Sequence, residues 1–288
     1  MRYVFVSDIH GQYQKLMDAL EAAKFNKETD TIVSLGDPFD RGHQSLEVLR
    51  FLMSCPNRIL VWGNHDYRLK QIFRHASWED YLAAYDFSNG VPATLQSFTG
   101  FSRQAGLDTA VYVFSHDPEF KEDYNLLQQY FNECVWAIEF KDLIGVHGWL
   151  PVKVGQDPYI QGLERRTLIE NWRDLKPSKK NEQLWEDAAW GNTIKCAADH
   201  CYPDKPLIIG HWHAWGLAEV FGHEQRKDPA INSNKIALDT PIDCSAFIYK
   251  EQGKVKFIAI DGCTILWSGI VNTYVYESDE APIKYDLR

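Results

Sequence analysis

The sequence lacks any apolar run long enough to cross a membrane, and it carries no excess of basic side chains. Lys and Arg number 30 against 40 Asp and Glu, so the formal net charge is −10. A transmembrane helix needs about 20 consecutive apolar residues, and recognition of a nucleic-acid backbone depends on clustered Lys and Arg. The composition therefore argues against a membrane-spanning protein and against nucleic acid as the main partner.

Cysteine is scarce and scattered along the chain. A chain of 288 residues with six cysteines is long enough to fold without disulfide cross-links, so we expect reduced thiols and a cytoplasmic location. The first apolar segment reaches a charged cluster too soon for a signal peptide. Cys196–Cys201 resembles half of a zinc site, but no second pair follows at the spacing of a zinc finger, so structural zinc is not the favoured interpretation.

Internal repeats, low-complexity segments and a convincing interdomain linker are also missing from the sequence. Hydrophobic residues make up 45% of the chain and aromatic residues 14%, which is enough for a substantial core. We therefore predict a single domain spanning residues 1–288, with a mostly helical insertion around residues 66–130.

The first part of the chain alternates strands and helices. β-Branched and aromatic runs predict strands at Tyr3–Ser7, Thr31–Leu35 and Arg58–Trp62, and the spacing of apolar residues predicts helices at Gln12–Ala23 and Ser45–Met53. This alternation is typical of α/β layering.

The later part of the chain is predicted to be richer in strands. We expect a hairpin from Val135–Phe140 and Leu143–Val146, and a helical, charged segment over residues 155–195. Four further strands are expected at Leu207–Ile209, Ala246–Tyr249, Val255–Ile260 and Ile270–Tyr276.

Five short polar clusters each follow a predicted strand. In open α/β sheets the chemistry collects in loops at the carboxyl ends of strands, so we expect these clusters to converge. They supply two carboxylates, one amide oxygen and four imidazoles, a mixed set that suits a pair of hard or borderline metal ions. The candidate ligands are Asp8, His10, Asp37, Asn64, His147, His211 and His213.

Three further residues in these clusters are candidates for catalysis. Arg41 carries a planar guanidinium that can hold phosphate oxygens. His65 follows a candidate ligand and can protonate a leaving oxygen, with Asp40 as the partner that orients it. Asp37 ends a strand predicted to neighbour the first, where its carboxylate can bridge two cations. A metal-bound hydroxide can hydrolyse a phosphoester when two metal ions and residues of these kinds are present.

Taken in order, the strings DIHG, GDPFDRG, GNHD, a later His-Gly and GHWH resemble the calcineurin-like metallophosphoesterases. The Asp-Arg-Gly extension is most similar to the phosphoprotein phosphatase branch, which includes serine/threonine phosphatases and diadenosine tetraphosphate hydrolases. The resemblance implies a four-layer α/β sandwich in which helices flank two central mixed β-sheets. It also implies a dinuclear centre, usually of manganese or iron with another divalent ion.

The resemblance also assigns roles to individual residues. One metal ion takes Asp8, His10, Asp37 and His213, and the other takes Asp37, Asn64, His147 and His211. His65 is the catalytic acid, Asp40 its partner and Arg41 the phosphate contact. The sequence departs from the pattern at Pro38-Phe39, at Asp66, where eukaryotic protein phosphatases usually carry Glu, and at His213, which many of them lack.

The substrate has two main candidates. The chain length and His213 favour a diadenosine polyphosphate or related nucleotide, a phosphoserine or phosphothreonine protein is the alternative, and a phosphodiester is a third candidate. A metal-binding scaffold without turnover is the alternative from another class, but such proteins lose the acid or a ligand. Trp212 and Trp215 flank the last motif and are expected to pack in the core or at its rim rather than against a base. Solvated positions are expected for Arg68, Arg103, Lys141, Arg165, Arg166 and Arg173, although they can line a polyphosphate pocket.

Overall fold

A computed structural model describes most of the chain, including all but one of the candidate residues. The described residues are 1–74, 88–101, 106–157, 160–176, 178–212, 214, 217, 220–221, 246–260 and 273–287. The candidate ligand His213 lies outside them, as do Trp215 and Arg103.

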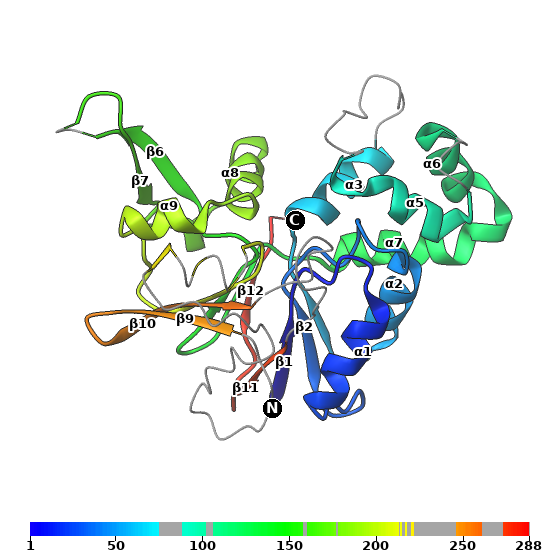
Figure 1. Ribbon diagram of the computed structural model, residues 1–288, viewed down its shortest axis with the longest axis horizontal. Helices are drawn as coiled ribbons and strands as arrows, with labels where there is room; N and C mark the ends of the chain where they lie inside the picture. The colour runs from blue at the N-terminus through cyan, green and yellow to red at the C-terminus, as the bar shows by residue number, and fades with distance from the viewer. Residues whose placement is uncertain are drawn as a thin grey trace.

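Two mixed β-sheets form the centre of the fold (Figure 1). The first has the strand order β11-β1-β2-β3, from Thr273–Glu277, Arg2–Val6, Thr31–Ser34 and Arg58–Leu60. The second has the order β12-β4-β5-β8-β10-β9, from Ile283–Tyr285, Ala137–Glu139, Ile144–Gly145, Leu207–Ile209, Lys254–Ile260 and Ala246–Glu251. β1, β2 and β3 are parallel, as are β5, β8 and β10, whereas the outer pairings are antiparallel.

Every second side chain of the strands points into the space between the two sheets and is buried there. Tyr3, Phe5 and Val33 of the first sheet pack in one cluster with Ile138 and Ile208 of the second. The intervening residues of β1 and β2 point to the opposite face, because successive side chains of a strand point to opposite sides. Helices α1 (Tyr13–Ala22) and α2 (Ser45–Ser54) cover that opposite face through apolar residues at helical spacing.

Aromatic residues join the outer face of the second sheet to helices α8 (Lys179–Ala189) and α9 (Thr193–Ala198). Trp185 of α8 stacks on Trp136, which precedes β4, with ring centroids 6.3 Å apart. Trp149 meets Phe257 of β10 edge to face at 6.0 Å. The arrangement of helices, sheet, sheet and helices confirms the four-layer α/β sandwich.

Between β3 and β4 most of the described residues are helical. The helices are α3 (Asn64–Arg74), α5 (Val91–Thr99), α6 (Leu107–His116), a short 3₁₀ turn (Pro118–Phe120) and α7 (Lys121–Glu133). The organisation of residues 1–288 as a single domain stays a prediction.

The helical prediction for residues 155–195 is wrong for its first part. Residues Val152–Gln156 (β6) and Glu164–Leu168 (β7) form an antiparallel two-stranded ribbon that projects from the fold (Figure 1). Arg165 and Arg166 lie in this ribbon and pair with Asp157 and Asp199 at 2.8 and 3.3 Å. Arg165 and Arg166 therefore form ion pairs, whereas the sequence suggested that their charges lie on the solvated face of a helix.

Glu139 of β4 joins the second sheet to three polar side chains outside β4. Its buried carboxylate accepts two hydrogen bonds from Arg173, at 2.8 and 2.9 Å, and others from Lys205 and Tyr285. Burial alone raises the pKa of a carboxyl group, but these donors outweigh it and lower the pKa of Glu139 to about 2.

We expect Glu139→Gln to reduce the free energy of unfolding by about 2 kcal/mol at pH 7, allowing for the partial exposure of Arg173 and Lys205. Because the folded pKa is below the unfolded one, the stabilisation is present above about pH 4.5 and fades as pH falls toward 2. Urea unfolding of both proteins at pH 7 and pH 3.5 measures this. An equal deficit at both pH values would mean that lost packing, not lost charge, causes the effect.

Candidate metal centre

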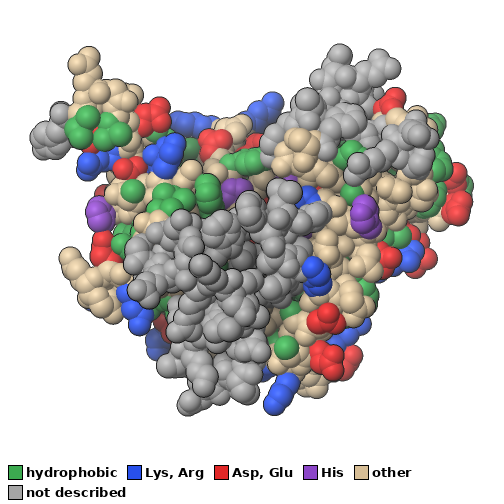
Figure 2. Space-filling view, viewed as in Figure 1, with side chains coloured by type: hydrophobic (Ala, Val, Ile, Leu, Met, Phe, Trp, Pro, Cys, Tyr) green, Lys and Arg blue, Asp and Glu red, His purple; other side chains and the backbone are tan. Residues whose placement is uncertain are grey.

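The candidate residues that the structure describes meet at the carboxyl ends of the parallel strands, as the order of the polar clusters in the sequence predicted. β1 delivers Asp8 and His10, β2 delivers Asp37, and β3 leads into α3, which begins with Asn64 and His65. His147 follows β5, which pairs with β8, and His211 follows β8. In Figure 1 this end of the sheets lies below the notch between the β6–β7 ribbon and the helices after β3, and in Figure 2 histidine side chains reach the surface there.

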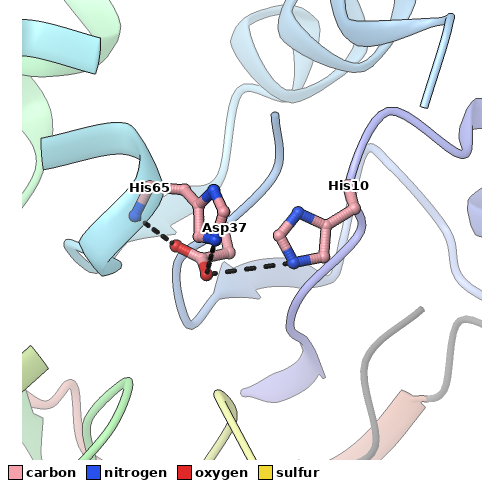
Figure 3. Close-up of side chains that lie close together, drawn as sticks. All are labelled: His10, Asp37 and His65. Atoms are coloured by element: carbon pink, nitrogen blue, oxygen red, sulfur yellow. Dashed lines mark hydrogen bonds and ion pairs between the residues drawn. The ribbon is translucent and has the colours of Figure 1, made fainter. Parts of the chain in front are cut away.

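Asp37 is the centre of the cluster. Its Oδ2 lies 3.9 Å from Nε2 of His10, 3.9 Å from Nε2 of His65 and 3.3 Å from Nε2 of His147. Figure 3 shows the imidazoles of His10 and His65 both directed at this carboxylate, and their ring centroids lie 4.8 Å apart. Two groups within the described residues have donor atoms close enough to hold a metal ion, His10–Asp37–His65 and Asp37–His147–His211, and Asp37 belongs to both.

Second contacts fix which nitrogen of each histidine faces Asp37. Nδ1 of His10 lies 2.7 Å from the carbonyl oxygen of Phe39, and Nδ1 of His147 lies 2.6 Å from that of Leu35. A carbonyl accepts only from a protonated nitrogen, so Nε2 of each ring is left to face the carboxylate. Metal-binding histidines are commonly oriented in this way.

The electrostatics of the cluster favour a positive charge between these groups. Nε2 of His147 lies 2.9 Å from the amide oxygen of Asn64 and faces Asp37. Burial opposes protonation of His147, but Asp37 and Asp8 outweigh it and raise the pKa of the imidazole to about 9. Nitrogen and oxygen donors that attract a proton this strongly also suit a divalent metal ion, so the residues present fit the group that the sequence predicted.

Asp8 lies at the same edge and completes the acidic part of the cluster. Its carboxylate accepts from the hydroxyl of Ser7 and, at 2.9 Å, from the backbone N–H of His211. Burial raises the pKa of Asp8, and the negative charge of Asp37 raises it further. Two buried carboxylates that repel each other indicate a place where a cation is needed.

The chain takes an unfavourable backbone conformation to bring these side chains together. Six candidate residues have φ between 47° and 70°, the left-handed region that residues other than glycine seldom adopt: Asp8, His10, Asp37, Asp40, Arg41 and His211. Such conformations cost free energy and cluster at functional sites. Gly63 is needed for a related reason, because a Cβ there would overlap the carboxylate and backbone of Asp37.

His65, Asp40 and Arg41 form a chain of contacts beside the cluster. Nδ1 of His65 donates to Oδ2 of Asp40 at 2.8 Å, and Nη2 of Arg41 lies 3.1 Å from Nε2 of His65. Burial opposes the charged form of His65, but Asp37 and Asp40 outweigh it and raise the pKa of its imidazole. The ring therefore has a fixed orientation and presents Nε2 to the cluster.

Thr94 is a participant that the sequence did not reveal. Its hydroxyl donates to Oδ1 of Asp40 and accepts from the backbone N–H of Asp40, both at 2.7 Å. Thr94 lies in α5, inside the helical insertion, and no spacing in the sequence connects it to Asp40. A pairing of this kind becomes visible only when the chain is folded.

Asp66 occupies a supporting position next to the candidate ligands. Its buried carboxylate accepts from the backbone N–H of Gly63 at 2.8 Å and from the hydroxyl of Tyr130 in α7 at 2.7 Å. Burial and the nearby Asp37 raise the pKa of Asp66 to about 7. Asp66 thus holds the turn that positions Asn64 and His65.

Trp212 is half-buried and its indole N–H donates to the carbonyl oxygen of Gly191 at 3.0 Å. Cys196 and Cys201 are buried free thiols in the described part of the chain, and they belong to neither group of donors that can hold a metal ion. Within the same part, no helix combines the length and apolarity that crossing a membrane requires.

Curated relatives match only a part of the chain. A symmetrical bis(5'-nucleosyl)-tetraphosphatase of Erwinia tasmaniensis is 43% identical over 74 residues, which cover 25% of this chain and 27% of the relative. One of Buchnera aphidicola subsp. Acyrthosiphon pisum is 41% identical over 81 residues, covering 28% and 29%. The matched segment thus spans little more than a quarter of the length of these relatives.

Solved structures are more distant in sequence. A crystal structure provisionally assigned as a diadenosine tetraphosphatase is 18% identical, covers 99% of this chain and 93% of its own, and has a TM-score of 0.47. A serine/threonine phosphatase from Saccharomyces cerevisiae is 13% identical, covers 98% and 81%, and has a TM-score of 0.39. Neither similarity is strong enough to support a conclusion about substrate.

A match to a protein family shows to which family the chain belongs. The model of the calcineurin-like phosphoesterases matches residues 1–231, a range that contains every candidate ligand and catalytic residue. The match covers well over half of the chain and agrees with the two mixed sheets and the cluster at their edge. The chain therefore belongs to the calcineurin-like phosphoesterase family.

Proposed function

We propose that this protein is a metal-dependent hydrolase that cleaves a phosphoanhydride bond of a dinucleoside polyphosphate. The observation that carries the proposal is the carboxylate of Asp37, which belongs to two groups of donors that can hold a metal ion, one of which also contains His65. The names of the partly matching relatives favour the nucleotide substrate.

The proposed ligands are Asp8, His10, Asp37, Asn64, His147, His211 and His213, with Asp37 shared between two metal ions. We expect manganese or iron there, since mixed imidazole and carboxylate donors suit both. When bound, such a pair activates a water molecule and polarises the phosphoryl oxygens. The four described cysteines that are free fit the expected cytoplasmic location.

His65 is proposed to supply the proton, and Arg41 to bind the phosphoryl oxygens of the substrate. Asp40 keeps Nδ1 of His65 protonated and its ring in place, so that Nε2 can pass a proton to the leaving oxygen. The guanidinium of Arg41, which lies beside that nitrogen, would hold the phosphoryl oxygens.

Metal removal tests the reaction class. Protein treated with a chelator should lose hydrolysis of diadenosine tetraphosphate and regain it with Mn²⁺. Comparison with a panel of phosphoserine and phosphothreonine peptides, with product analysis, separates the nucleotide substrate from the phosphoprotein alternative. Failure to hydrolyse any of these with manganese or iron present would favour a scaffold without turnover.

Thr94 provides a test of the proposed catalytic pair. We expect Thr94→Val to lower kcat/KM by about 10-fold, because Asp40 loses a donor and an acceptor while the residue keeps its shape. Thr94→Ser keeps the hydroxyl and should restore most of the activity. Thr99→Val is the matched control, since Thr99 is also buried in α5 but donates to the carbonyl oxygen of Leu95. Equal losses in the Thr94 and Thr99 variants would indicate a general effect on the helix.

A further inference from the structure

A surface hollow opens beside the candidate metal centre and is partly lined by residues without a role in the proposed chemistry. Asp40, Asn64 and His65 form its inner side. Its remaining lining residues are Arg68, Asn89, Val91 and Trp190. A group that occupies the hollow therefore lies next to the proposed catalytic acid, His65.

Trp190 presents an aromatic surface to this hollow. It is 40% exposed, unlike the fully buried Trp149 and Trp172. Its ring centroid lies 6.2 Å from that of His211, with the two rings at 85°. A large exposed indole next to a polar cluster offers a face on which a planar base can stack.

The backbone around Trp190 is held rigidly. The residue ends α8, and its N–H donates to the carbonyl oxygen of Glu186 at 3.2 Å. Gly191 donates to Ala188 at 2.9 Å and accepts from the indole of Trp212. A side chain at Gly191 would collide with Trp149, so the turn is closely packed. A closely packed turn limits the positions open to the indole, which reduces the entropy lost when a ligand stacks on it.

Arg68 lies on the other wall of the hollow, which α3 forms. Arg68 is one helical turn after Asn64, so both side chains lie on the same face of the helix. Tyr67 donates to Glu182 at 2.8 Å, a contact that joins α3 to α8 beside the hollow. Burial raises the pKa of the Glu186 carboxyl, and the positive charge of Arg68 opposes that rise. Arg68 also lines the hollow, where a guanidinium can meet a second anionic group of a ligand.

We propose that this hollow binds one nucleoside half of the substrate, with the base stacked on Trp190 and a neighbouring phosphate held by Arg68. The inference rests on the proposed function and deepens it, because it names the features by which a nucleotide differs from a phosphopeptide. A phosphorylated side chain has one phosphate and, in serine or threonine, no ring to stack.

Binding of four small ligands that are not hydrolysed distinguishes stacking on Trp190 from phosphate binding by Arg68. Isothermal titration calorimetry on the Mn²⁺-loaded protein would measure Kd for ADP, AMP, pyrophosphate and phosphate. We expect Trp190→Ala to raise Kd about 10-fold for ADP and AMP, and to leave pyrophosphate and phosphate unchanged. Trp190→Phe should keep most of the affinity. Arg68→Gln should raise Kd about 10-fold for ADP and pyrophosphate only.

The outcomes keep this inference distinct from the proposed function. If the wild type hydrolyses diadenosine tetraphosphate but Trp190→Ala binds ADP unchanged, the stacking site is wrong and the proposed function stands. If the ADP and AMP effects are found but diadenosine tetraphosphate is not cleaved, the hollow binds nucleotides and the proposed reaction is wrong. Equal effects of Trp190→Ala on all four probes, or failure of the wild type to bind any of them, would overturn the inference.

Discussion

Replacing His65 by alanine is expected to lower kcat by roughly 100- to 10,000-fold, the usual range for loss of a general acid. His65 lies in one of the two donor groups, but the proposal assigns it to proton transfer and the neighbouring Asn64 to the metal, so the variant should keep its metal ions. The backbone N–H of His65 donates to the carboxylate of Asp37, and Nδ1 of its ring donates to Asp40, so the ring is held in place for proton transfer.

The leaving group decides whether protonation is the cause. The deficit of His65→Ala should shrink for a nitrophenyl phosphoester, whose leaving oxygen is already acidic, compared with an alkyl phosphoester. Rates on both substrates, together with metal analysis of the protein, measure this. His116→Ala is a suitable control because His116 is exposed on α6. A variant that is equally impaired on both esters, or that has lost its metals, would contradict the assigned role.

Replacing Asp37 by alanine should instead remove metal and activity together. Asp37 faces His10, His65 and His147 and belongs to both groups of donors, so its loss affects two metal positions at once. We expect metal affinity to fall by at least about 100-fold, since even changes behind the direct ligands cost 10- to 100-fold. Elemental analysis of the purified protein would show the loss, and thermal unfolding should no longer respond to added Mn²⁺.

Asp40→Asn is the informative comparison for this variant. Asp40 contacts His65 and Thr94 and belongs to neither group of metal-binding donors. The Asp40 variant should therefore lose activity while retaining both metal ions. If Asp37→Ala keeps its full metal content, Asp37 does not bridge the two ions and the proposed centre is incorrect.

The sequence determined the parts of this protein that depend on neighbours along the chain. β-Branched runs and helical spacing placed β1, α1, β2, α2 and β3 to within about two residues, because these local patterns persist in the folded state. Polar clusters after buried strands also revealed the candidate site, since parallel strands bring their carboxyl ends to one edge. Its main carboxylate and imidazoles were therefore recognisable from residue type and order alone.

Only the tertiary structure decided the contacts that join distant segments. Thr94 reaches Asp40, Tyr130 reaches Asp66, and Trp190 comes to line a hollow with His65, although no motif links these positions. The ribbon of β6 and β7 was missed for the same reason, because its charges pair across the fold. Such pairings depend on how whole elements pack, and the strongest local signals in a sequence carry no information about that packing.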